Sequence, residues 1–132
     1  MPIASQEDLT IRAFIVRERR ERFLELLGSA KHRHKITDSL AHPHPAWFDS
    51  RFVRQIPPAQ SGASGIARLL HAKGAGPRCW VISENKTTDA REMELEPILA
   101  ELVGGGMGAI LCCVPGKLAF VESEDGRFIL EK

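Results

Sequence analysis

The sequence of 132 residues contains no apolar run of the roughly 18 residues needed to cross a bilayer. Its first residues also lack the basic start and apolar core of a secretory signal, so we expect a soluble, cytoplasmic protein that does not contact membranes. Only three cysteines are present, and they cannot all pair, which favours a reducing compartment. Internal repeats and low-complexity tracts are absent as well, and the length predicts one globular domain covering residues 1–132.

Neither sign of charge dominates, because the formal net charge is only +1. The charge is nevertheless uneven: residues 1–78 carry a net +6, whereas residues 79–132 carry a net −5. Clustered arginines could bind nucleic acid through counterion release. Glutamates alternate with the arginines of Arg17–Arg22, however, and few aromatic residues stand nearby for base stacking. Nucleic acid is therefore a possible partner but not the favoured one.

The N-terminal third has the pattern of helical structure. Apolar residues recur at three- and four-residue steps from Leu9 to Leu27, which predicts one long helix ending at Gly28. The alternative is that Thr10–Val16, rich in β-branched residues, forms a strand before a shorter helix. A second helix is expected from Ser29 to about Ala41, so that the two helices form a hairpin.

The middle of the chain begins with a break in helical structure. Prolines in His42–Pro45 stop helix formation, and an aromatic connector then runs to Ile56 as a loop or short strand. A short amphipathic helix is expected between Ser61 and Gly76. The Gly-rich start of this helix, Ser61–Gly65, has no following lysine of the kind that phosphate loops carry.

The C-terminal half predicts a sheet with one helix. Buried strands are expected at 79–82, 109–114, 118–121 and 128–130, and an amphipathic helix at 95–103. A strand, a helix and a second strand usually form a right-handed crossover with parallel strands. The predicted fold class is α+β, with α/β as the alternative: an N-terminal helical hairpin packed on a mixed sheet with one βαβ crossover followed by two antiparallel hairpin strands.

Parallel strands would bring two polar turns to one edge of the sheet. The turn after Ile82 and the turn at Pro115–Lys117 would then open on the same side, where α/β sheets place their ligands. The candidate binding residues are Ser83, Glu84, Asn85, Lys86, Asp89, Arg91 and Lys117. The alternative is a polar loop in which Thr88 or Asp89 caps the next helix.

Other motifs favour no cofactor and no metal. The glycines of Gly104–Gly108 leave a helix and enter a strand, which is the wrong direction for a phosphate cradle. Whether His42 and His44 bind a metal, with Asp49 as a third ligand, stays open, since an extended chain could aim both rings the same way. The adjacent Cys112 and Cys113 should point to opposite faces of a strand and behave as small core residues.

Several short motifs resemble a family of small bacterial proteins that has no assigned activity. They are Cys79–Glu84, Arg91–Met93, Gly106–Gly108 and Pro115–Ala119, with a looser match at Arg22–Leu27. The resemblance implies a bacterial, cytoplasmic protein and no particular chemistry.

The function expected from the sequence is a non-catalytic binding or interaction module for an unknown protein or small-molecule ligand. The alternative is a small hydrolase or phosphodiesterase that uses the 83–92 loop and Lys117. Whether it is an enzyme stays open, because the sequence contains no recognisable set of nucleophile, base and orienting group. Apolar residues on both faces of the last strands also need covering on both sides. Either the N-terminal helical hairpin covers the second face, or a twofold partner does; the homodimer is favoured, with Phe120 and Phe128 as candidate contacts if their face is left open.

Overall fold

The computed structural model describes residues 5–132 of the chain. The helices are α1 (Ser5–Phe14), α2 (Arg17–Leu27), α3 (His34–Thr37), α4 (Ala63–Ala72) and α5 (Leu95–Leu102). The strands are β1 (Val53–Gln55), β2 (Arg78–Ser83), β3 (Arg91–Glu94), β4 (Ala109–Val114), β5 (Leu118–Ser123) and β6 (Gly126–Glu131). Short 3-10 turns at Pro45–Trp47, Ser50–Phe52 and Pro58–Gln60 complete the fold. None of the helices in this described part is long and apolar enough to cross a membrane.

The strands form one six-stranded sheet in the order β1-β6-β5-β4-β2-β3, so the α+β class is confirmed. Every neighbouring pair is antiparallel, including β2 with β4, where Ser83 lies opposite Ala109. The parallel pairing expected for these two strands is therefore wrong. The hairpin turns after β4 and β5 are confirmed.

The error has its origin in β3, a strand whose residues were expected to belong to a polar loop. β3 runs antiparallel to β2, and β2 runs antiparallel to β4, so β3 and β4 are parallel to each other with β2 between them. Helix α5 thus joins β3 to β4 across one face of the sheet. The crossover exists, but it leaves from β3, and β2 occupies the gap between its two strands.

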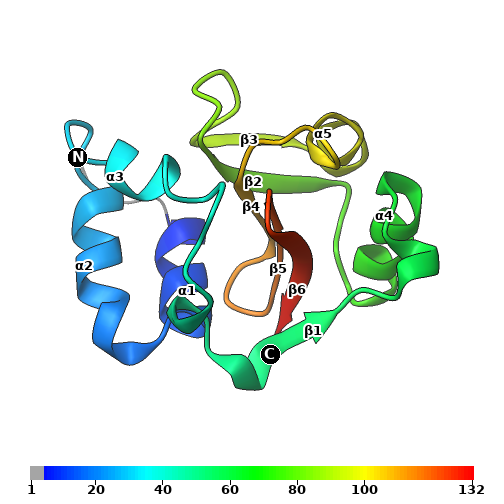
Figure 1. Ribbon diagram of the computed structural model, residues 1–132, viewed down its shortest axis with the longest axis horizontal. Coiled ribbons are helices and arrows are strands. Elements are labelled where there is room, and N and C mark those ends of the chain that lie inside the picture. Colours follow the sequence, from blue (N-terminus) through cyan, green and yellow to red (C-terminus); the bar gives the residue numbers. More distant parts are fainter. Residues whose placement is uncertain (1–4) are drawn as a thin grey trace.

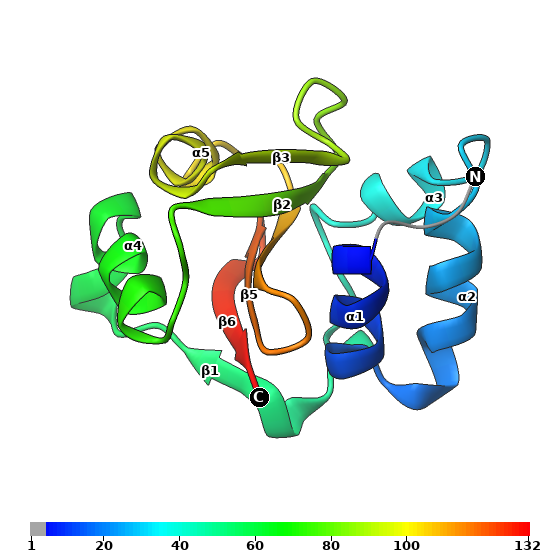
Figure 2. The same ribbon diagram turned by 180° about the vertical axis from the view of Figure 1, so that it is seen from behind.

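Helices cover both faces of the sheet, as Figures 1 and 2 show: α1, α2 and α3 lie on one side, and α4 and α5 lie on the other. The side chains of the strands alternate between two apolar clusters. Ile110 and Val121 pack with the N-terminal helices, whereas Leu111 and Phe120 pack with α4 and α5. All six residues of β5 are buried as a result.

This arrangement removes the reason for expecting a homodimer through the sheet. Phe120 has 0% of its surface exposed and is covered by the chain's own helices, so it is not available as a subunit contact. Phe128 is half-buried and stacks edge-on against Phe48, with 5.1 Å between ring centroids. The N-terminal helices thus cover the second face, and the open face on which this homodimer contact depended is not present.

The N-terminal helical pair is present, but its boundaries differ from the prediction. One long helix was expected, yet the chain breaks at Ile15, which forms an isolated bridge with Phe48. Val16 N donates to Trp47 O at 2.8 Å, and these backbone bonds interrupt the helix. The strand alternative for Thr10–Val16 is also wrong, since α1 continues to residue 14. The second expected helix, residues 29–41, is reduced to the four residues of α3 and irregular turns.

Candidate functional site

The two halves of the predicted site lie at opposite ends of the sheet. Because β4 is antiparallel to β2, the residues after Ser83 lie near the start of β4. Lys117 belongs to the turn after β4, where its backbone N donates to Val114 O at 2.9 Å. That turn is at the end of the sheet where β2 begins. The prediction that Lys117 shares an edge with the loop containing Asn85 is wrong, because it depended on parallel strands.

The loop from Ser83 to Arg91 is held closed by its own side chains. Asp89 Oδ1 accepts a hydrogen bond from Ser83 N at 2.9 Å, and Ser83 Oγ accepts one from Asn85 N at 3.0 Å. Asn85 Oδ1 in turn accepts bonds from the backbone N and the hydroxyl of Thr87, at 3.0 and 2.7 Å. These polar groups stabilise the turn.

Glu84 has a structural contact of its own. Its Oε1 accepts a hydrogen bond from Gly108 N at 2.7 Å, while Glu84 N donates to Gly108 O at 3.2 Å. Gly108 is needed at this position because a Cβ there would overlap the backbone of Leu40. Glu84 thus fixes the end of the glycine-rich segment against the start of the loop.

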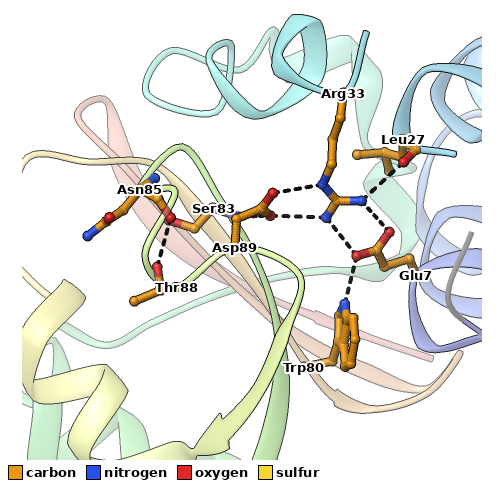
Figure 3. Close-up of polar contacts among 8 residues, drawn as sticks. All are labelled: Glu7, Leu27, Arg33, Trp80, Ser83, Asn85, Thr88 and Asp89. Atoms are coloured by element: carbon orange, nitrogen blue, oxygen red, sulfur yellow. Dashed lines mark hydrogen bonds and ion pairs between the residues drawn. The ribbon is translucent and has the colours of Figure 1, made fainter. Parts of the chain in front are cut away.

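Asp89 reaches across to the N-terminal helices through Arg33. Arg33 Nε and Nη2 donate to the two carboxylate oxygens of Asp89 at 2.7 and 3.0 Å. Arg33 Nη1 and Nη2 donate to the two oxygens of Glu7 at 2.8 and 2.7 Å. The guanidinium therefore binds two carboxylates in the bidentate geometry that gives strong, directional pairing (Figure 3).

Two further bonds complete this group, which we call the Arg33 network. Arg33 Nη1 also donates to Leu27 O at 3.1 Å, and Trp80 Nε1 donates to Glu7 Oε2 at 2.7 Å (Figure 3). The Glu7 side chain is only 1% exposed. Burial opposes the charge of Arg33, but the hydrogen bonds from Glu7 and Asp89 outweigh it and hold the pKa of Arg33 above its usual value.

The Arg33 network acts as a structural link rather than a reactive centre. Each carboxylate oxygen of Glu7 and Asp89 accepts a hydrogen bond from another group of the chain, so neither carboxylate is placed as a free base at an open site. It connects α1, the segment before α3, β2 and the 83–90 loop. In the sequence, Glu7 reads as an acidic residue near the positive end of a helix and Arg33 as part of a basic run, and no local pattern marks them as partners.

Lys86 and Arg91 are the remaining candidates, and both are exposed. Neither forms an ion pair with any residue from 5 to 132. Arg91 opens strand β3, directly after Ala90, whose φ of 57° is in the left-handed region. Of the seven predicted residues, four therefore support the loop, whereas Lys86, Arg91 and the distant Lys117 are exposed and form no ion pair within residues 5–132.

The cysteines gather at the opposite end of β2 from this loop. Cys79, Cys112 and Cys113 are all buried free thiols that line a hollow of about 140 Å³. Burial raises the pKa of Cys79 and of Cys112 to about 12, so their thiols are protonated at neutral pH. Within the described range, no three side chains of His, Cys, Asp or Glu are arranged to hold a metal ion.

A larger hollow lies where the end of α4 and the start of α5 meet the sheet, and we call it the α4–α5 hollow. It has a volume of about 650 Å³ and is open to solvent. Its lining residues are His71, Ala75, Gly76, Pro77, Arg78, Glu94, Glu96 and Pro97. No sequence pattern points to it, since these residues belong to separate segments that only the fold brings together.

The charged groups of the α4–α5 hollow are only partly paired. His71 Nδ1 bonds to Ala75 O at 3.0 Å, which aims Nε2 toward Glu96 Oε2, 3.5 Å away. Arg78 is engaged with Glu92 at 2.6 Å, whereas Glu94 has no ion pair within residues 5–132. Carboxylates thus prevail over available cations here.

Comparisons with known proteins give no match: no family model, no curated protein and no solved structure is similar to this chain.

Proposed function

We propose that this protein is a non-catalytic binding module and that its ligand lies in the α4–α5 hollow. The observation that carries the proposal is the hollow itself, with about 650 Å³ of space, apolar walls at Pro77 and Pro97, and carboxylates at Glu94 and Glu96. Binding sites combine a concave, largely preformed surface with a few polar groups, and the hollow has both features.

The positions of the polar groups outside the α4–α5 hollow favour binding over catalysis. The hydrolase alternative needed the 83–92 loop and Lys117 in one cleft, and antiparallel β2 and β4 keep them apart. Within the loop, Ser83 and Asp89 are bonded to neighbouring groups of the chain. The buried thiols are protonated and are poor nucleophiles.

The proposal can be tested by filling the hollow. Gly76 lines it, has ordinary backbone geometry and would have nothing within 4 Å of an added Cβ, so Gly76→Trp should fold normally. Gly62 has the same freedom outside the hollow, and Gly62→Trp is the matched control. The probe is a library of small charged fragments, followed by NMR on isotope-labelled protein.

The expected result is a set of fragments that shift the amides of His71, Gly76 and Glu96. These shifts should disappear in Gly76→Trp and persist in Gly62→Trp. If the fragments instead shift residues around the 83–90 loop, or bind equally well to both variants, the proposed function is wrong.

The cellular setting belongs to the same proposal. A cytoplasmic location fits three thiols that are free and buried, because a reducing compartment keeps such cysteines unpaired. A homodimer stays a prediction that has lost its proposed contact at Phe120. A protein or small-molecule ligand fits the α4–α5 hollow better than nucleic acid does, because Glu94 and Glu96 would repel phosphates.

A further inference from the structure

The α4–α5 hollow adjoins a free sheet edge. Strand β3 is the last strand of the sheet, and only β2 pairs with it among the described strands. Leu95 N donates to Pro77 O at 2.8 Å. Leu95 continues the register in which Met93 lies opposite Cys79, so Met93 and Leu95 are the positions whose backbone groups point toward β2. Because bonded directions alternate along an antiparallel strand, the backbone groups of Glu92 and the N–H of Glu94 point away from β2. The carbonyl of Glu94 belongs to α5, because Glu94 is the N-cap residue of that helix. An extended chain can therefore add to this edge.

The part of this edge that lies next to the α4–α5 hollow is acidic. Glu92, Glu94 and Glu96 are all exposed, and they follow one another from β3 into the start of α5. Arg78 Nε lies 2.6 Å from Glu92 Oε1 and forms an ion pair with it. Arg78 Nη2 also donates to the backbone O of Glu92, but at 3.5 Å this hydrogen bond is weak. Glu94 has no ion pair within residues 5–132, and Glu96 has only the 3.5 Å contact with His71, so both carboxylates can attract a cation from outside.

The hollow suits the side chain of a lysine or arginine in particular. Such side chains lay their methylene stems along apolar surface and keep the charged head near polar groups. Pro77 and Pro97 supply apolar walls, and Glu94 and Glu96 supply the acceptors. At the other end of β3, Arg91 is exposed and carries the opposite charge.

We propose that the ligand is an extended peptide segment that adds antiparallel to β3 and places a basic side chain in the α4–α5 hollow. This inference rests on the proposed function and names the class of its ligand. In an antiparallel addition, the N-terminal part of the segment lies beside Glu94 and the later part lies beside Arg91. The segment should therefore carry lysine or arginine first and an acidic residue about three positions later, as the length of β3 requires.

The probe is a short capped peptide in which lysine alternates with valine and an aspartate follows, labelled with a fluorophore for anisotropy. Three comparison peptides are needed: one with the order of charges reversed, one with glutamate in place of lysine, and one with methylated backbone nitrogens on the edge-facing side. The reversed peptide tests direction, the glutamate peptide tests charge, and the methylated peptide tests backbone pairing.

The first peptide should bind, and each comparison peptide should bind about tenfold more weakly, because each lacks a charge pair or a backbone bond that the first peptide forms. The double variant Glu94→Gln, Glu96→Gln should weaken binding by about the same factor. Glu101→Gln is the matched control, because Glu101 is an exposed glutamate of α5 outside the hollow, and it should leave binding unchanged.

Three outcomes would overturn the inference in distinguishable ways. If charged fragments bind in the hollow and are lost in Gly76→Trp, but no peptide binds, the proposed function stands and the peptide class is wrong. If the methylated and unmethylated peptides bind equally, the ligand does not pair with β3. If neither fragments nor peptides bind, the proposed function fails together with the inference.

Discussion

Replacing Arg33 with methionine should strongly destabilise the fold, because it removes the cation between Glu7 and Asp89. All the N–H groups of the guanidinium are used, on two carboxylates and on Leu27 O. The side chains of Glu7 and Asp89 are 1% and 16% exposed, so water cannot replace the lost partner at Glu7. Breaking a buried pair by removing one member costs about 3–5 kcal/mol.

The measurement is urea unfolding at neutral pH, followed by circular dichroism. The stability of Arg33→Lys should lie between that of the parent and that of Arg33→Met, since a lysine ammonium cannot bind both carboxylates in bidentate fashion. Arg12→Met is the control: its ion pair with Asp8, at 3.0 Å, is on the surface with the Arg12 side chain 52% exposed. That control should lose less than about 1 kcal/mol.

An Arg33→Met protein within about 1 kcal/mol of the parent at neutral pH would refute the view that this network holds the N-terminal helices to the sheet.

Three further perturbations test the packing of the sheet. With the pKa of Cys79 and Cys112 at about 12, both thiols should react with a disulfide reagent roughly a thousandfold more slowly in the native protein than in denaturant; equal rates would contradict their burial. Phe120→Asp should unfold the chain, as seen by circular dichroism, because Phe120 is 0% exposed; a folded monomer would contradict that placement. Gly108→Ala should cost at least about 2 kcal/mol in urea unfolding, because its Cβ would overlap the backbone of Leu40, and an unchanged midpoint would contradict the contact.

The parts of the fold that could be predicted from the sequence are those with a strong apolar period. Helix α5 repeats apolar residues on one face, and β4 and β5 are apolar runs separated by a Pro-Gly turn. Strand β3 has no such pattern, since its four residues, Arg-Glu-Met-Glu, are mostly charged and exposed. It is a strand because β2 offers it backbone partners, and an edge strand can keep its charges in water.

Missing β3 had a larger effect than the loss of four residues. Along the chain, β3 comes between β2 and β4, and it reverses the direction of the chain once more than expected. The strands β2 and β4, predicted to be parallel, are therefore antiparallel. The candidate site failed for this reason at Lys117, although Ser83, Asn85 and Asp89 do lie in one polar loop. The partners of Asp89 could not be read locally, because Arg33 is 56 residues away in the sequence and Glu7 is 26 residues from Arg33.

The last prediction concerns His42, which ties the loop after α3 to the turn between β5 and β6. Its Nδ1 lies 3.0 Å from Asp125 Oδ1, and its Nε2 lies 2.6 Å from Glu124 Oε2. Asp125 foremost, with a smaller contribution from Glu124, raises the pKa of His42 above its ordinary value of 6.5. The folded protein therefore binds this proton more tightly than the unfolded chain does. The resulting stability is fully present below the unfolded pKa and is lost as the pH rises through the higher, folded pKa.

The urea midpoint of the parent should thus fall between mildly acidic and mildly alkaline pH by more than that of His42→Gln. His34→Gln is the control, because His34 is exposed and forms no ion pair among residues 5–132, and its profile should follow the parent. Identical profiles for the parent and His42→Gln would mean that this contact between the loop and the hairpin does not form in solution.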